Sequence, residues 1–166
     1  MLFVADMMLK KLARWLRILG VDVSYPKDSR DDYLLELTRE KGAVLLTMDV
    51  ALVQRAKQQN LHAFLVPTRA LEEQLAVILH TFNISLASFP SRIICPTCNG
   101  ALKETGKEEV IGKVPEKTLA SHDKFWLCTS CSAVFWEGSH WEKIKETVEK
   151  VKVALANQET SVTSST

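Results

Sequence analysis

The sequence has little excess charge and no long hydrophobic run. Its 166 residues include 21 lysines and arginines against 20 acidic residues, a formal net charge of +1. Such a small charge gives no chain-wide attraction to nucleic acid, so any basic surface must be local. No apolar run approaches the roughly 20 residues of a membrane span, and Asp6 interrupts the apolar start that a signal peptide would need. We therefore expect a soluble, cytoplasmic protein without a membrane partner.

Hydrophobic residues make up 46% of the sequence and charged residues 25%. This apolar content is sufficient for one sizeable core, or for one core and a small satellite. Short apolar runs alternate with segments whose apolar residues recur at helical spacing. This alternation is typical of an α/β fold, a parallel sheet with helices on both faces. A helix over roughly Arg69–Phe82 closes the unit. The predicted strands are Leu2–Ala5, Val21–Tyr25, Ala43–Thr47 and His62–Val66.

Two of the predicted strands run directly into an aspartate. Asp6 follows "MLFVA", Asp49 follows "VLLTM", and Asp31 opens the helix after the second strand. Ligands of an open parallel sheet bind beyond the carboxyl ends of its strands, so we expect the three carboxylates to converge there. Clustered carboxylates repel one another unless a cation lies between them, and Mg²⁺ or Mn²⁺ prefers such oxygen ligands. The pattern predicts a catalytic site for metal-assisted phosphodiester hydrolysis.

The same acids also fit a structural role. Aspartate is a preferred helix N-cap, and Asp6, Asp31, Asp32 and Asp49 each precede or begin a predicted helix. Asp32 fits best as a first-turn residue that the helix dipole favours. For the other three, the expected convergence on one sheet edge favours catalysis over capping.

The first predicted helix, "LKKLARWLRILG", carries a basic stripe. At about 100° per residue, Lys10, Arg14 and Arg17 lie within roughly 60° of one another, opposite the leucines that face the core. The stripe lies on the side of Asp6, where it would bind the backbone of a nucleic acid without reading its sequence. Taken alone, three basic residues fit a solvated helix face better.

Four cysteines form two CxxC pairs, Cys95 with Cys98 and Cys128 with Cys131. Two such pairs place four thiolates around a structural Zn²⁺. Disulfides fit poorly with a chain for which no export signal is expected, and neither pair follows a strand and opens a long helix as a redox motif does. The 29 residues between the pairs exceed the usual spacing of about 15 to 20, so we expect an insertion, a hairpin around "KEEVIGKVPEK".

The end of the chain combines an amphipathic segment with a polar one. His140 is expected to be a packed or surface residue rather than a ligand. Residues 157–166 are polar, which predicts a disordered tail. Apolar residues at helical spacing predict a helix over 141–156 that docks on the domain or on another subunit, as in a homo-oligomer: Trp141, Ile144, Val148, Val151 and Leu155.

The order of the motifs resembles the Mut-7 C-terminal RNase domain family over roughly residues 1–145: "FVADMMLKKLARWLRILGVDV", "DDYLLEL", "VLLTMD", the two CxxC pairs and "FWEGSHW". The resemblance implies a PIN-like nuclease domain at residues 1–90, a zinc ribbon at 91–140, and then the C-terminal helix and tail. It also implies metal-dependent RNase activity with Asp6, Asp31 and Asp49 as the catalytic set.

One residue departs from the family pattern. Met48 stands between the threonine and the aspartate of "LLTMD", where the family usually has an arginine. Glu73 and Gln74, in "LEEQL", resemble a family segment whose role is unassigned.

Three classes of function are compatible with the sequence. The first is a ribonuclease that uses a divalent metal on the three aspartates. The second is a non-catalytic RNA-binding module that uses the basic helix and the ribbon. The third is a protein-interaction module. Intact acids at all expected positions favour the first, because a pure RNA binder gains nothing from carboxylates that face a polyanion.

Overall fold

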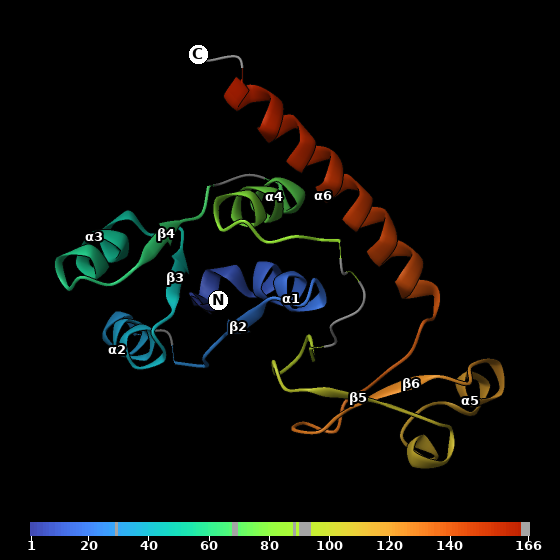
Figure 1. The fold of residues 1–166 in the computed structure, drawn as a ribbon. Helices are drawn as coiled ribbons and strands as arrows, with labels where there is room; N and C mark the ends of the chain where they lie inside the picture. Colours follow the sequence, from blue (N-terminus) through green and yellow to red (C-terminus); the bar gives the residue numbers. More distant parts are fainter. Residues whose placement is uncertain (29, 68–69, 88, 90–93, 164–166) are drawn as a thin grey trace.

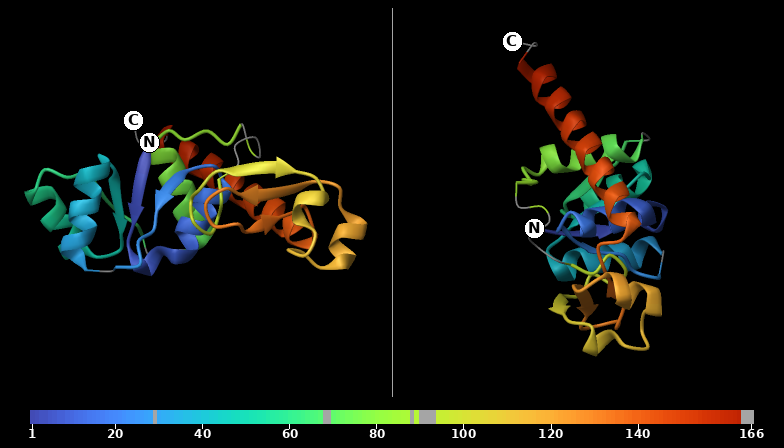
Figure 2. Two further views of the ribbon diagram at one scale, coloured as in Figure 1. Left: turned by 90° about the horizontal axis from the view of Figure 1, so that it is seen from below. Right: turned by 90° about the vertical axis from the view of Figure 1, so that its right-hand side faces the viewer.

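The computed structural model describes residues 1–28, 30–67, 70–87, 89 and 94–163, with side chains as far as residue 158. It contains a larger lobe built on a parallel sheet and a smaller β-rich lobe. A long C-terminal helix leaves the smaller lobe and passes over the larger one (Figures 1 and 2). Within these residues, no helix combines the length and the apolar character needed to cross a membrane.

The larger lobe contains a four-stranded sheet in the order β2-β1-β3-β4, with every neighbouring pair parallel. The predicted strands are confirmed, although three of them are shorter by a residue at one or both ends. Because the strands are parallel, all their carboxyl ends lie at one edge of the sheet. The bounds are β1 Leu2–Ala5, β2 Asp22–Ser24, β3 Val44–Thr47 and β4 Ala63–Leu65.

Helices cover both faces of this sheet. Alternate residues of a strand point to opposite faces, so Val4 and Leu45 pack with α2 and α3, whereas Phe3 and Leu46 pack with α1 and α4. Burial on both faces explains why the strands read as continuous apolar runs. The helices are η1 Met7–Leu9, α1 Lys10–Ile18, α2 Asp31–Lys41, α3 Val50–Gln58 and α4 Leu71–Thr81. Arg69, the predicted start of the last of these helices, lies outside the described residues.

The C-terminal helix, α6, spans Ser139–Thr163 and packs along α4 of its own chain. Val148 and Val151 are 2% and 0% exposed in the core cluster that also contains α1 and α4. The prediction of a disordered tail from residue 157 was wrong for residues 157–163, whose backbone continues the helix. Neither glycine nor proline interrupts the sequence between residues 139 and 163, so no helix-ending signal is present.

The smaller lobe is a three-stranded antiparallel sheet made of β5 Leu102–Thr105, β6 Phe125–Cys128 and β7 Val134–Phe135. The predicted hairpin around residues 107–117 was wrong. This insertion contains the 3-10 turn η2 Glu108–Val110 and leads into the short helix α5 Glu116–Ser121. Its apolar side chains Val110 and Val114 pack on Phe125 in a small separate core, which a two-stranded hairpin would not provide. The predicted start of the ribbon at residue 91 lies outside the described residues.

Candidate active site and metal centre

Asp6 follows β1 at the carboxyl edge of the sheet and is only 8% exposed. Its backbone N–H donates to Leu46 O at 3.0 Å, which continues the pairing of β1 with β3. Its Oδ2 accepts a hydrogen bond from Thr47 Oγ1 at 2.7 Å. The Asp6 side chain makes no capping hydrogen bond to η1, so the capping interpretation does not hold here. A carboxylate buried this deeply is costly unless it is paired, and the hydroxyl of Thr47 is the one donor that the described residues give it.

Asp49 is the N-cap of α3. Its Oδ1 accepts from Ala51 N at 2.7 Å and from Leu52 N at 3.2 Å, so the capping interpretation is right for this residue. Both capping bonds use Oδ1, which leaves Oδ2 of this exposed side chain for another ligand. Capping and metal binding are therefore compatible in Asp49.

Thr47 connects the two aspartates. Its hydroxyl accepts from Asp49 N at 3.0 Å and donates to Asp6 Oδ2 at 2.7 Å. The side chain is fully buried at 0% exposure, so its rotamer is fixed by packing as well as by these bonds. The pair Asp6 and Asp49 is thus held at one point of the sheet edge.

Asp31 opens α2 at the same edge but has a cationic partner. Its Oδ2 lies 2.7 Å from Nη1 of Arg55 in α3, and Arg55 also pairs with Asp32. Among the residues that the structure describes, no three carboxylates are placed to share one metal ion. The structure thus links the Asp6 carboxylate to the backbone of Asp49 through Thr47 and holds Asp31 on Arg55, so a metal-binding role for the three carboxylates stays a prediction.

The four cysteines come together as the sequence predicts. Their sulfurs all lie within 4.8 Å of one another, with 3.7 Å between Cys95 and Cys131 and 3.4 Å between Cys98 and Cys128. Four sulfurs at about 2.3 Å around a tetrahedral Zn²⁺ would be about 3.8 Å apart. None of the four is in a disulfide. The cluster therefore fits a structural zinc ion in a ribbon.

Backbone N–H groups point at the sulfurs of this cluster. Gly100 N donates to Cys98 Sγ at 3.4 Å, and Ser130 N donates to Cys128 Sγ at 3.4 Å. Burial alone would raise the pKa of Cys128, but the N–H groups of Cys131 and Ser130 and the thiols of Cys98 and Cys131 together lower that pKa to about 7. Burial raises the pKa of Cys95, and that of Cys98 to about 12, so without metal the four sulfurs are not equally disposed to ionise. Thiolates are the form of cysteine that binds metal.

The three basic residues of the predicted stripe do not share one surface. Lys10 and Arg14 are exposed, whereas Arg17 is only 5% exposed. Arg17 Nε donates to Val23 O at 2.9 Å, and its Nη1 donates to the carbonyl oxygens of Pro96 and Thr97 at 3.3 and 3.0 Å. The expectation of Arg17 on an open RNA-binding face was therefore wrong, because the ribbon covers this end of α1.

Arg17 instead connects the larger lobe to the first cysteine knuckle. Burial lowers its pKa, an effect that the charges of Cys98, Cys95 and Asp22 oppose. Asn99 adds two further contacts, since its Oδ1 accepts from Val23 N at 3.1 Å and its Nδ2 donates to Asp22. The knuckle is thus docked on the edge of β2.

Three residues of the site had not been identified from sequence. Thr47 had a usable signal, because a hydroxyl residue ends an apolar strand two positions before an aspartate. Arg55 and Asn99 had none, because their partners lie 24 and 77 positions away in the chain. Only the packing of α3 on α2, and of the ribbon on β2, brings those pairs together.

The fold and the two clusters define an α/β protein with acids at the carboxyl edge of a parallel sheet and an attached four-cysteine ribbon. The chain belongs to the Mut7-C RNAse domain family, whose model matches residues 1–148. The match confirms the family predicted from the motifs and indicates a nuclease or RNA-related function. Neither a curated protein nor a solved structure was found to match the chain.

Proposed function

We propose that the protein is a divalent-metal-dependent ribonuclease that hydrolyses RNA phosphodiester bonds at the carboxylates of Asp6 and Asp49. The observation that carries the proposal is Asp6, a carboxylate 8% exposed with one neutral hydrogen-bond donor among the described residues. Such a group favours a cation beside it. Mg²⁺ in nucleotide-processing sites needs only one or two carboxylates, with water and phosphate oxygens as its other ligands.

Each residue of the edge has a distinct task in this proposal. Thr47 holds the carboxylate of Asp6 and the backbone of Asp49 in a fixed geometry, and Asp49 offers Oδ2 while Oδ1 caps α3. Bound Mg²⁺ or Mn²⁺ would activate water and neutralise charge on the leaving oxygen. Asp31 becomes a third ligand if its carboxylate leaves Arg55 and binds the metal. The partial exposure of the Asp31 side chain leaves room for the rotation that this exchange requires.

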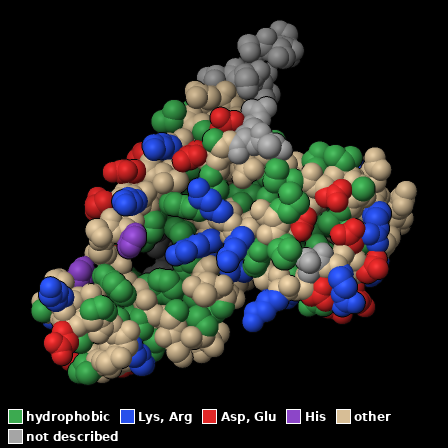
Figure 3. Space-filling view, turned by 180° about the vertical axis from the view of Figure 1, so that it is seen from behind, with side chains coloured by type: hydrophobic (Ala, Val, Ile, Leu, Met, Phe, Trp, Pro, Cys, Tyr) green, Lys and Arg blue, Asp and Glu red, His purple; other side chains and the backbone are tan. Residues whose placement is uncertain are grey.

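Lys10 and Arg14 supply the phosphate contacts of the proposed substrate. Both are exposed on α1, the helix that follows Asp6 and η1. Figure 3 shows lysine and arginine side chains gathered in the middle of one face, beside hydrophobic side chains. Contacts of this kind attract an RNA backbone without selecting its sequence. The zinc ribbon contributes by fixing the far end of α1 through Arg17.

A cytoplasmic location is part of the proposal, because unpaired cysteines persist in reducing compartments. The packing of α6 on α4 within one chain removes the main reason for expecting a homo-oligomer through that helix. RNA is therefore the partner that the proposal requires.

Cleavage of single-stranded RNA by the zinc-loaded protein tests this function. We expect the wild-type protein to cleave RNA with Mn²⁺ or Mg²⁺ and not to cleave it without added divalent cation. Asp6→Asn should cleave at least a hundredfold more slowly, which is the loss found when a group that stabilises transition-state charge is removed. The asparagine amide oxygen can still accept from Thr47 Oγ1, so the fold should be retained. Cation-independent cleavage, or wild-type activity in Asp6→Asn, would refute the proposal, and RNA binding without cleavage would favour the non-catalytic RNA-binding alternative.

A further inference from the structure

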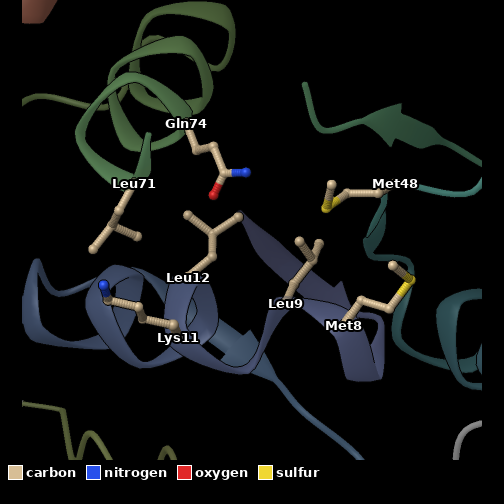
Figure 4. Close-up of a pocket in the computed structure, with 7 residues that line it drawn as sticks. All are labelled: Met8, Leu9, Lys11, Leu12, Met48, Leu71 and Gln74. Atoms are coloured by element: carbon tan, nitrogen blue, oxygen red, sulfur yellow. The ribbon is translucent and has the colours of Figure 1, made fainter. Parts of the chain in front are cut away.

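A small cavity of about 250 Å³ is lined in part by Met8 and Met48, which are close in the chain to Asp6 and Asp49. Its walls come from η1 and the start of α1 on one side, and from α4 and the residue after β3 on the other (Figure 4). Its lining combines methionine and leucine side chains with one ammonium and one amide group: Met8, Leu9, Leu12, Met48, Leu71, Lys11 and Gln74.

The cavity and the aspartates share the same short segments. Met48 lies between Thr47 and Asp49, and Met8 lies two residues after Asp6. The cavity wall and the two aspartates are therefore carried by the same short segments of the chain. Met8 is 68% exposed, so this wall is accessible from solvent.

The orientation of the Gln74 amide is fixed by its partner. Its Nε2 donates to the carbonyl oxygen of Pro67 at 3.0 Å, and a carbonyl can only accept, so the nitrogen must face that way. The remaining atom, Oε1, is directed toward the cavity wall formed by Leu12 (Figure 4). No donor among the described residues contacts this oxygen. Gln74 therefore presents a hydrogen-bond acceptor to a ligand.

This combination of groups selects a class of ligand. Thioether and leucine walls favour a flat, polarisable ring, and Oε1 of Gln74 requires an N–H donor on the edge of that ring. The ammonium of Lys11 at the rim favours an adjoining phosphate. The volume of about 250 Å³ is below the roughly 300 to 1,000 Å³ of pockets for drug-sized ligands, which suits one ring system and excludes a helix.

We propose that this cavity binds one unpaired base of the RNA substrate, through its ring faces on Met8 and Met48 and through an N–H donor to Gln74 Oε1. The inference rests on the proposed function and adds to it a subsite next to the cleaved phosphate. It also assigns a role to Met48, whose apolar side chain forms part of the wall where an arginine would instead place a charge. The protein should therefore act on single-stranded rather than fully paired RNA, because only an unstacked base can enter.

Binding measured without added divalent cation tests the subsite separately from cleavage. The probe is a fluorescent short oligoadenylate, with an abasic residue placed at each position in turn, titrated with zinc-loaded full-length protein. One abasic position should weaken binding to the wild-type protein by about tenfold, the usual effect of losing one stacked base. Met48→Ala should bind the intact oligomer more weakly and lose most of this sensitivity. Leu65→Ala is the control, because Leu65 is 44% exposed at the same sheet edge but does not line the cavity.

A second comparison isolates the hydrogen bond to Gln74. Replacing the adenosine at the sensitive position by purine riboside removes only the 6-amino donor, and should cost the wild-type protein about threefold in affinity. Gln74→Leu should bind the two oligomers equally. Wild-type protein and Gln74→Leu, each measured with both oligomers, form a double-mutant cycle. A variant that only binds RNA more weakly in general would lose affinity for both oligomers equally and would show no coupling in this cycle.

The outcomes distinguish the subsite from the catalytic proposal. Base-dependent binding that depends on Met48 and Gln74, in a protein that never cleaves RNA, would uphold the subsite and refute hydrolysis. Cleavage in the wild type, with equal abasic sensitivity in the wild type and in Met48→Ala, would refute the subsite alone. Absence of RNA binding, or abasic effects that are the same at every position, would also overturn it.

Discussion

Thr47 is the residue on which the geometry of the site depends. Its hydroxyl is both the acceptor for the Asp49 N–H and the donor to a buried carboxylate oxygen of Asp6. Hydrogen bonds to charged groups are worth more than neutral ones, and a buried charge left without its donor bears the full cost of desolvation. A small neutral side chain therefore determines how two acids are presented.

Thr47→Val should lower the free energy of unfolding by about 1 to 3 kcal/mol, because the shape is kept while the donor to Asp6 is lost. Thr38→Val is the matched control. Thr38 is also buried and donates to Leu34 O at 2.7 Å, but that acceptor is a neutral carbonyl that already receives a helix hydrogen bond. Urea unfolding of both variants gives the comparison. Equal losses would mean that the hydroxyl does not stabilise the carboxylate.

The aspartates illustrate what the sequence could predict at the scale of residues. An acid directly after an apolar strand is visible in "VLLTMD", and both Asp6 and Asp49 lie at the predicted edge. Pairing of Asp31 with Arg55 was not predictable, because it depends on the packing of α2 beside α3. Burial of Arg17 was missed for a similar reason, since the covering knuckle is 79 positions away.

At the scale of elements, the first cysteine knuckle and β2 act as one unit. Arg17 Nη1 donates to Pro96 O and Thr97 O, and Asn99 bonds the backbone of Val23. These hydrogen bonds join two lobes whose hydrophobic clusters are separate. A side chain of α1 therefore sets the position of the ribbon.

Arg17→Met should loosen the ribbon while the parallel sheet stays folded, because the aliphatic part of the side chain is kept and the carbonyls of Pro96 and Thr97 lose their donor. Hydrogen exchange of the amides of residues 94–101 should accelerate by about tenfold or more, since a hydrogen bond to a charged group contributes roughly 1.5 to 3 kcal/mol. Arg14→Met, an exposed position on the same helix, should leave that exchange unchanged. Similar exchange in both variants would contradict this role of Arg17.

Apolar periodicity alone was insufficient to predict every helix and strand and where each one ends. The four strands and α4 were predicted from apolar spacing, and the structure confirms them within about two residues. The fold of the insertion between the cysteine pairs was not predicted correctly, because it depends on the packing of Val110 and Val114 on Phe125. The end of α6 was also misplaced, because polar composition indicates low apolar burial but does not itself end a helix.

At the scale of the whole molecule, the ribbon depends on its cysteine cluster. Three buried residues, Val110, Val114 and Phe125, make up its hydrophobic core, which is small for an independently stable unit. A structural zinc ion contributes folding energy directly in such segments. The larger lobe has two extensive clusters of its own, so we expect it to stay folded without the metal.

The wild-type protein should bind about one zinc ion per chain. Cys131→Ser should bind less, because three sulfurs do not complete a tetrahedral site. The exposed His140 provides the control, and His140→Ala should retain the metal. Zinc loss should unfold residues 94–138 and leave the sheet folded, as followed by metal analysis together with hydrogen exchange. Full zinc content in Cys131→Ser, or loss in His140→Ala, would contradict the four-cysteine site.

Hydrolysis of RNA at the aspartates of the sheet edge is tested by the rate at which Asp49→Asn cleaves single-stranded RNA under saturating Mn²⁺. Asparagine caps a helix about as well as aspartate, so α3 and the overall stability should be preserved while one metal ligand is lost. Asp32→Asn is the matched control, because Asp32 is an exposed acid of α2 that pairs with Arg55. We expect at least a hundredfold loss of cleavage in Asp49→Asn and little change in Asp32→Asn. Cleavage by Asp49→Asn at the wild-type rate would contradict hydrolysis at these aspartates.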